Sequence, residues 1–147
     1  MTVSKKTALA LTAALLLGSA GFAPAAWAQK RDNVLFDAAT SEQPAVVKTL
    51  ERLVKIESGT GDAEGIAAAG SLLEGELKAL GFTVTRQKAA GAVVGDNIVG
   101  KLRGRGGKSL LLLSHMDTVY PRGMLAKAPF RIEGNKAYGP GIADDKG

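Results

Sequence analysis

The most constraining feature of this sequence is a run of four leucines, Leu110–Leu113, followed directly by Ser114-His115-Met-Asp117. A short apolar run bounded by turn residues is typical of a strand covered on both faces, in a sheet packed between helices. We therefore expect residues 109–115 to form a buried strand. Such a strand would present an imidazole and a carboxylate where it ends.

Two helices are predicted before this strand. The first begins at Ser41-Glu-Gln-Pro44, where a hydroxyl cap precedes a proline in the first turn. Residues 29–40 are expected to form a polar N-terminal arm. The helix has an apolar face at helical spacing. That face consists of Val46, Val47, Leu50, Leu53 and Val54.

A second helix is predicted from a cap at Asp62 to about Leu80, with Gly81 ending it in a left-handed conformation. Its expected buried stripe is Ile66, Gly70, Leu73, Leu77 and Leu80.

Short strands complete the predicted elements. They are expected over residues 82–86, 97–102, 130–132 and 136–138. Two helices followed by three or more strands, one of them fully buried, indicate an α/β fold. We expect the N-terminal part of a three-layer α/β/α domain.

The first 28 residues have the layout of a secretory signal peptide: basic Lys5-Lys6, an apolar centre, and Ala26-Trp-Ala28 as a cleavage site. An uncleaved membrane anchor is the alternative. We expect a mature chain over residues 29–147, exported to the periplasm or secreted. Without the two leader lysines the net charge falls from +5 to +3. The remaining basic residues are scattered, which argues against a nucleic-acid partner. No membrane association is expected after cleavage.

The sequence has no cysteine, so any metal must be bound through nitrogen and oxygen. His115 and Asp117 share one side of the expected strand, and a metal-bound imidazole usually donates its other N–H to a carboxylate. Alone, such a pair is more often structural. Asp144-Asp145 follows a Gly-Pro-Gly turn, and adjacent carboxylates favour a cation between them. A solvated loop with Lys146 as the partner of the two acids is the alternative.

Together the two motifs, Ser114-His-Met-Asp-Thr-Val119 and Gly139-Pro-Gly-Ile-Ala-Asp-Asp-Lys-Gly147, resemble the N-terminal part of the co-catalytic zinc exopeptidases. That family includes glutamate carboxypeptidases, aminoacylases, acetylornithine deacetylases and succinyl-diaminopimelate desuccinylases. The likeness is strongest to its folate-hydrolysing glutamate carboxypeptidases. It also extends over residues 30–36, 59–70 and 126–130, and so covers the mature chain.

The resemblance implies a role for each site residue. His115 would be a ligand of one of two zinc ions, and Asp144 the carboxylate that bridges both. Asp117 would be the catalytic-site carboxylate that orients His115. Asp145 is assigned no catalytic role. A non-proline cis peptide bond is expected between Asp144 and Asp145.

The implied activity is zinc-assisted hydrolysis of the amide bond to a C-terminal glutamate, in folate-like or N-acyl-glutamate substrates. The general-base glutamate, the remaining ligands and a dimerisation domain are expected beyond Gly147. The sequence is therefore interpreted as a fragment, with weak or no zinc binding and no activity by itself, of a protein that forms a homodimer.

Two alternatives remain open at this point. The first keeps the metal chemistry but changes the reaction to N-acyl-amino-acid deacylation or dipeptide cleavage. The second is a non-catalytic periplasmic binding module in which His115 and Asp117 are merely structural.

Overall fold

The structure is a computed structural model, and it describes residues 31–147. The leader expected over residues 1–28 lies outside the described residues. Of the described residues, 31–36 belong to one unit and 37–147 to a second. Among the described residues, no helix is both long and apolar enough to cross a membrane.

The first helix, α2 (Asn33–Val54), begins eight residues before the predicted start. Oδ1 of Asp32 accepts hydrogen bonds from the backbone N–H groups of Val34 and Leu35, as an N-cap does. Pro44, read from sequence as a first-turn residue, therefore lies inside the helix. The predicted arm over residues 29–40 is wrong from Asn33 onward, because the Asp32 side chain caps a helix that begins there.

Helix α2 buries only its C-terminal end. Leu53 and Val54 are 7% and 1% exposed, whereas Val46 is 61% exposed. The apolar face predicted from periodicity is thus covered over its last turn and largely open before it.

The second helix, α3 (Ala63–Ala79), matches its prediction closely. The side chain of Asp62 accepts a hydrogen bond from the N–H of Gly65 at the N-terminus. At the other end Gly81 has φ +85°, and the N–H of Phe82 donates to the carbonyl of Leu77, which is a Schellman ending. Leu80 is the exception in the predicted stripe, because it is 69% exposed.

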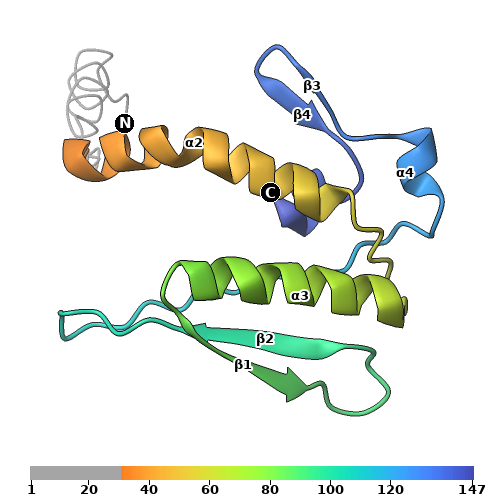
Figure 1. The fold of residues 1–147 in the computed structure, drawn as a ribbon, viewed down its shortest axis with the longest axis horizontal. Helices are drawn as coiled ribbons and strands as arrows, with labels where there is room; N and C mark the ends of the chain where they lie inside the picture. The colour runs from red at the N-terminus through yellow and green to blue at the C-terminus, as the bar shows by residue number, and fades with distance from the viewer. Residues whose placement is uncertain (1–30) are drawn as a thin grey trace, which may run out of the picture. The chain divides into compact units, whose positions relative to one another are not determined.

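Strands β1 (Thr83–Lys88) and β2 (Asp96–Lys101) form an antiparallel hairpin in which Thr83 pairs with Lys101. Helix α3 packs along this hairpin (Figure 1). The face of the helix that carries Gly70 allows close approach. A Cβ on Gly70 would lie 3.4 Å from the Ile98 side chain. A second hairpin pairs β3 (Arg131–Glu133) with β4 (Lys136–Tyr138), close to the predicted positions. A short helix not predicted from sequence, α4 (Met124–Lys127), precedes it.

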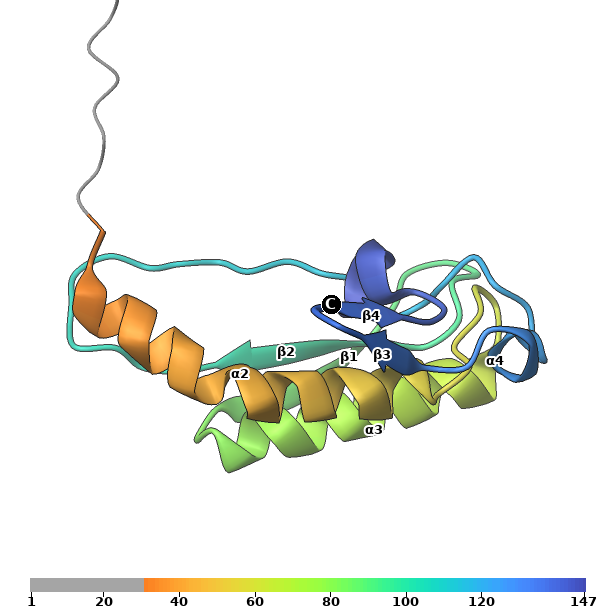
Figure 2. The same cartoon turned by 90° about the horizontal axis from the view of Figure 1, so that it is seen from above.

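The prediction of a buried strand over residues 109–115 is wrong for this structure. The segment pairs with no strand among the described residues, and Leu110–Leu113 are 81–86% exposed. Figure 2 shows it as a long cyan trace that runs without a flanking strand. The described strands form two separate two-stranded sheets, and neither of them covers the leucines. The α/β character is confirmed. The sheets among the described residues have two strands each, so the three-layer arrangement stays a prediction.

Candidate active site

Residues 116–118 are fixed by a short pairing with the turn that follows helix α2. The N–H of Thr118 donates to the carbonyl of Ser58, and the N–H of Thr60 donates to the carbonyl of Thr118, both at 2.8 Å. Gly59 and Thr118 form a parallel bridge between these segments. The hydroxyl of Ser58, which is fully buried, donates to the carbonyl of Met116 at 2.7 Å. The open leucine segment therefore ends at a well-anchored point.

His115 stands immediately before this anchor, and its ring has a defined hydrogen-bonding pattern. Nδ1 lies 3.0 Å from the backbone oxygen of Asp117 and 3.2 Å from Oδ1 of the same residue. Both neighbours can only accept, so Nδ1 carries the proton. In the neutral imidazole, Nε2 is then the atom with the free lone pair.

Asp144 lies in front of that lone pair. Its Oδ1 is 3.0 Å from Nε2 of His115, and its side chain is 74% exposed. The turn Ile142–Lys146 positions it, after Gly141 at φ +77°. A Cβ on Gly141 would come within 2.5 Å of the Thr118 side chain, so glycine lets the turn lie against the anchored segment. The peptide bond between Asp144 and Asp145 is cis, which confirms that prediction.

The two residues after Asp144 attach the turn to its surroundings. The carboxylate of Asp145 accepts a hydrogen bond from the N–H of His115 at 3.4 Å, and its backbone oxygen accepts one from the hydroxyl of Ser114 at 3.3 Å. The ammonium of Lys146 donates to the carbonyls of Leu53 and Ile56 at the C-terminal end of α2. The alternative in which Lys146 pairs with the two acids is not what the structure contains.

The charges of the site raise one pKa and lower another. The pKa of His115 is raised above 6.5, first by its hydrogen bond to Asp144 and then by its contact with the backbone of Asp117, while burial opposes the shift. The pKa of Asp117 is lowered, first by the hydrogen bond from the Thr60 hydroxyl, then by a hydrogen bond from its own backbone N–H and by the nearby imidazole, against desolvation. Asp117 is therefore ionised at neutral pH.

The pair His115 and Asp144 fits a shared cation. Two ligand atoms bound to one tetrahedral zinc ion at about 2.0–2.1 Å lie about 3.3 Å apart, close to the observed separation of 3.0 Å. Imidazole nitrogen and carboxylate oxygen are both ligands that zinc accepts. Among residues 31–147, however, no group of three or more histidine, cysteine or acidic side chains surrounds one point. The described residues thus bring together two side chains that could bind a metal ion, His115 and Asp144, and the carboxylate of Asp117 beside the imidazole.

The structure brings together the three residues singled out from sequence, His115, Asp117 and Asp144. Sequence reasoning missed Ser58 and Thr60, which were read only as part of a turn. The signal available was a pair of hydroxyl residues flanking Gly59 directly after a helix.

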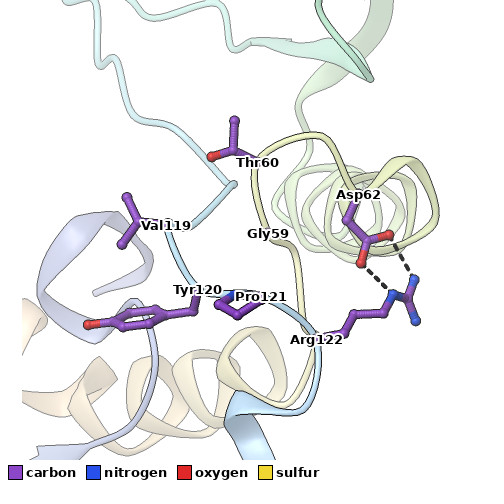
Figure 3. Close-up of a pocket in the computed structure, with 7 residues that line it drawn as sticks. All are labelled: Gly59, Thr60, Asp62, Val119, Tyr120, Pro121 and Arg122. Atoms are coloured by element: carbon purple, nitrogen blue, oxygen red, sulfur yellow. Dashed lines mark hydrogen bonds and ion pairs between the residues drawn. The ribbon is translucent and has the colours of Figure 1, made fainter.

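A pocket lies beside the anchored pairing. Figure 3 shows the lining residues Gly59, Thr60 and Asp62 on one segment and Val119–Arg122 on the other. At one end the guanidinium of Arg122 contacts both carboxylate oxygens of Asp62, at 2.6 and 2.7 Å. The carboxylate of Glu57 accepts hydrogen bonds from the N–H groups of Gly123 and Leu125, both at 2.8 Å. These contacts hold the residues after the site against the start of α3 and against the turn that follows α2.

The sequence is 77% identical to Carboxypeptidase G2 of Pseudomonas sp. (strain RS-16) over 134 residues, which are 91% of this chain and 32% of that protein. It is 30% identical to a peptidase M20 domain-containing protein of Schizosaccharomyces pombe over 140 residues, 90% of this chain and 33% of that protein. No protein-family model matches the sequence. The chain spans about a third of the length of the curated relatives it matches. These similarities confirm the resemblance read from the two motifs: over about nine-tenths of its length, the chain is similar to Carboxypeptidase G2 and to a peptidase M20 domain-containing protein.

Proposed function

We propose that this chain supplies part of the active site of a zinc-dependent glutamate carboxypeptidase. His115 would be a ligand of one zinc ion, Asp144 would bridge two ions, and Asp117 would orient His115. When bound, zinc would activate a water molecule and polarise the scissile carbonyl. The remaining ligands and the general-base glutamate would come from residues outside this chain.

One observation carries the proposal. In the neutral ring Nδ1 holds the proton, so the lone pair of Nε2 faces a carboxylate oxygen at 3.0 Å. Two acceptors at that distance repel each other unless something positive lies between them. A proton can take that place, and so can a metal ion. The 77% identity to Carboxypeptidase G2 favours the metal.

The chain's own residues would do three things in such a site. Asp117 holds the proton on Nδ1 and so leaves Nε2 free as a ligand. The N–H of His115 and the hydroxyl of Ser114 donate to Asp145, which keeps the turn bearing Asp144 close to the imidazole. Lys146 fastens the same turn to α2.

Further features of the whole protein are part of the proposal. The substrate would end in glutamate, as in folate-like or N-acyl-glutamate compounds. The leader over residues 1–28 would direct the protein to the periplasm or outside the cell, and the complete protein would be a homodimer. The exposed leucines of residues 110–113 would lie inside a three-layer α/β/α domain completed by other residues. The chain alone would bind zinc weakly and would be inactive.

The test uses the complete gene product that includes this chain. Hydrolysis of a pteroyl-glutamate is compared with that of an N-acetylated amino acid, with and without a chelator. We expect zinc-dependent release of glutamate from the first substrate. Preference for the acetylated amino acid would instead identify a deacylase. No hydrolysis of either substrate, with unchanged zinc content in His115→Gln, would leave the non-catalytic module as the explanation.

A further inference from the structure

The turn Ser58-Gly-Thr60 lies alongside Met116-Asp-Thr118 and pairs with it through hydrogen bonds. Hydrogen bonds run in both directions between their backbones, and the Ser58 hydroxyl adds a side-chain bond to Met116. The two segments are 58 positions apart in the sequence, yet they meet residue by residue. The position of Asp117 is therefore set from the turn after α2 as much as from its own segment.

Gly59 is what permits this close approach. A Cβ at residue 59 would lie 2.6 Å from the backbone oxygen of Tyr120, a separation that real side chains do not adopt. Gly59 is also buried. The pairing thus depends on the order of residues 58–60, in which a glycine lies between two residues with hydroxyl side chains.

The hydroxyl of Thr60 has one proton and two acceptors within reach. Oγ1 lies 2.7 Å from Oδ2 of Asp117 and 3.2 Å from the backbone oxygen of Thr118. The shorter contact is to an ionised carboxylate, and charge-assisted hydrogen bonds are shorter and stronger than neutral ones. The proton is therefore donated to Asp117.

The two oxygens of Asp117 then have different partners. Oδ2 receives the Thr60 hydroxyl, while Oδ1 lies 3.2 Å from Nδ1 of His115. A carboxylate held at one oxygen cannot rotate about its Cβ–Cγ bond without giving up that contact. Because the side chain of Asp117 is only 34% exposed, water has limited access to its carboxylate and competes less with these two contacts.

We propose that Thr60 is a positioning residue, whose hydroxyl fixes the carboxylate that orients His115. The inference rests on the proposed function, because it assumes that His115 binds metal. It assigns a purpose to a side chain whose hydroxyl contacts Asp117 and the backbone of Thr118. Removing the hydroxyl should let Asp117 rotate, so that His115 is held less firmly.

The experiment compares three variants of the complete gene product with the wild-type protein. Thr60→Val removes the hydroxyl and keeps the shape, and Thr60→Ser keeps the hydroxyl. Thr85→Val makes the same chemical change on strand β1, where Thr85 is exposed and remote from the site. Zinc affinity is measured by competition with a chelator, and kcat and KM are measured separately.

We expect Thr60→Val to weaken zinc binding and lower kcat, each by about 10-fold, the low end of the effect of outer partners of metal ligands. KM should change by less than twofold, because the hydroxyl would act through Asp117 on metal binding. Thr60→Ser should restore most of both losses, and Thr85→Val should behave like the wild-type protein. If Thr60→Val fails to fold, Thr60→Ala is measured in its place.

Two results would overturn the inference: unchanged zinc affinity and kcat in Thr60→Val, or equal losses in Thr60→Val and Thr60→Ser. In an Asp117→Asn background the Thr60→Val change should have no further effect on zinc affinity, since the hydroxyl acts through that carboxylate. If Asp117→Asn and His115→Gln themselves leave zinc binding unchanged, the proposed function fails as well. If they abolish binding while Thr60→Val does nothing, the inference about Thr60 fails alone.

Discussion

Nε2 of His115 lies 3.0 Å from Oδ1 of Asp144, although the two residues are 29 positions apart. The contact joins the end of an extended segment to an irregular turn, and both are fixed elsewhere. His115 is followed by the pairing with Ser58–Thr60, and Asp144 is followed by Lys146, whose ammonium donates to the carbonyl of Leu53 on α2. The pair therefore meets because two separate anchors bring it together.

The first prediction concerns pH. In the zinc-free complete gene product the pKa of His115 should lie above 6.5, because its imidazolium is stabilised by Asp144. The stabilisation of the fold from this contact should be fully present below pH 6.5 and be lost as the pH rises through the raised pKa. Protons and zinc compete for Nε2, so zinc affinity should rise over the same interval.

Titration of the imidazole resonances by NMR measures that pKa directly. Asp144→Asn should lower it, and Glu133→Gln, on strand β3 and exposed, should leave it unchanged. A pKa of His115 at or below 6.5 in the zinc-free protein would contradict the contact described here.

The second prediction concerns Lys146, whose ammonium donates to two carbonyls at the end of α2. Lys146→Met keeps the apolar stem and leaves those carbonyls without this donor. We expect a loss of about 1–3 kcal/mol in the free energy of unfolding, measured by urea denaturation. Lys127→Met, on the exposed side of α4, serves as the control and should change stability by less than about 0.5 kcal/mol.

The third prediction compares two glycines of helix α3. A Cβ on Gly65 would lie 1.9 Å from the carbonyl oxygen of Glu57, whereas a Cβ on Gly75 would meet nothing within 4 Å. Gly65→Ala should destabilise the protein by at least about 2 kcal/mol. Gly75→Ala should stabilise it by about 0.5–1 kcal/mol, because alanine loses less backbone entropy in a helix. Thermal and urea unfolding of both variants measure the difference, and equal effects would refute the close approach at residue 65.

The fourth prediction concerns the 147-residue chain by itself. Its leucines at 110–113 are exposed and pair with no strand among residues 31–147, so the chain should self-associate. Leu111→Lys combined with Leu113→Lys should reduce that association. Sedimentation and light scattering at several concentrations report it. A monomer at high concentration with a single cooperative melt would show that the leucines are covered.

Local rules in the sequence located most of the elements. The cap at Asp62 and the glycine at residue 81 fixed both ends of α3, because these signals act within one turn of the helix. The start of α2 was misplaced because Pro44 is also tolerated inside that helix. The leucine run failed as a guide to burial, since burial depends on neighbours and none of the described strands provides them.

For the site, the two motifs predicted which residues would meet, and the structure places His115, Asp117 and Asp144 together. Their roles as ligands and as orienting carboxylate stay predictions. Thr60 could not be found in the same way. Its importance comes from a pairing with a segment 57 positions away, and no periodicity or spacing encodes such a contact.

That distant pairing has a consequence for the order of folding. Helix α3 and the hairpin beside it can form from neighbouring stretches, whereas joining Ser58 to Met116 requires a long loop to close first, at an entropic cost. The geometry around His115 should therefore be among the last parts of this chain to form. A protein interrupted on the way would have regular helical structure and an imidazole with nothing to hold it.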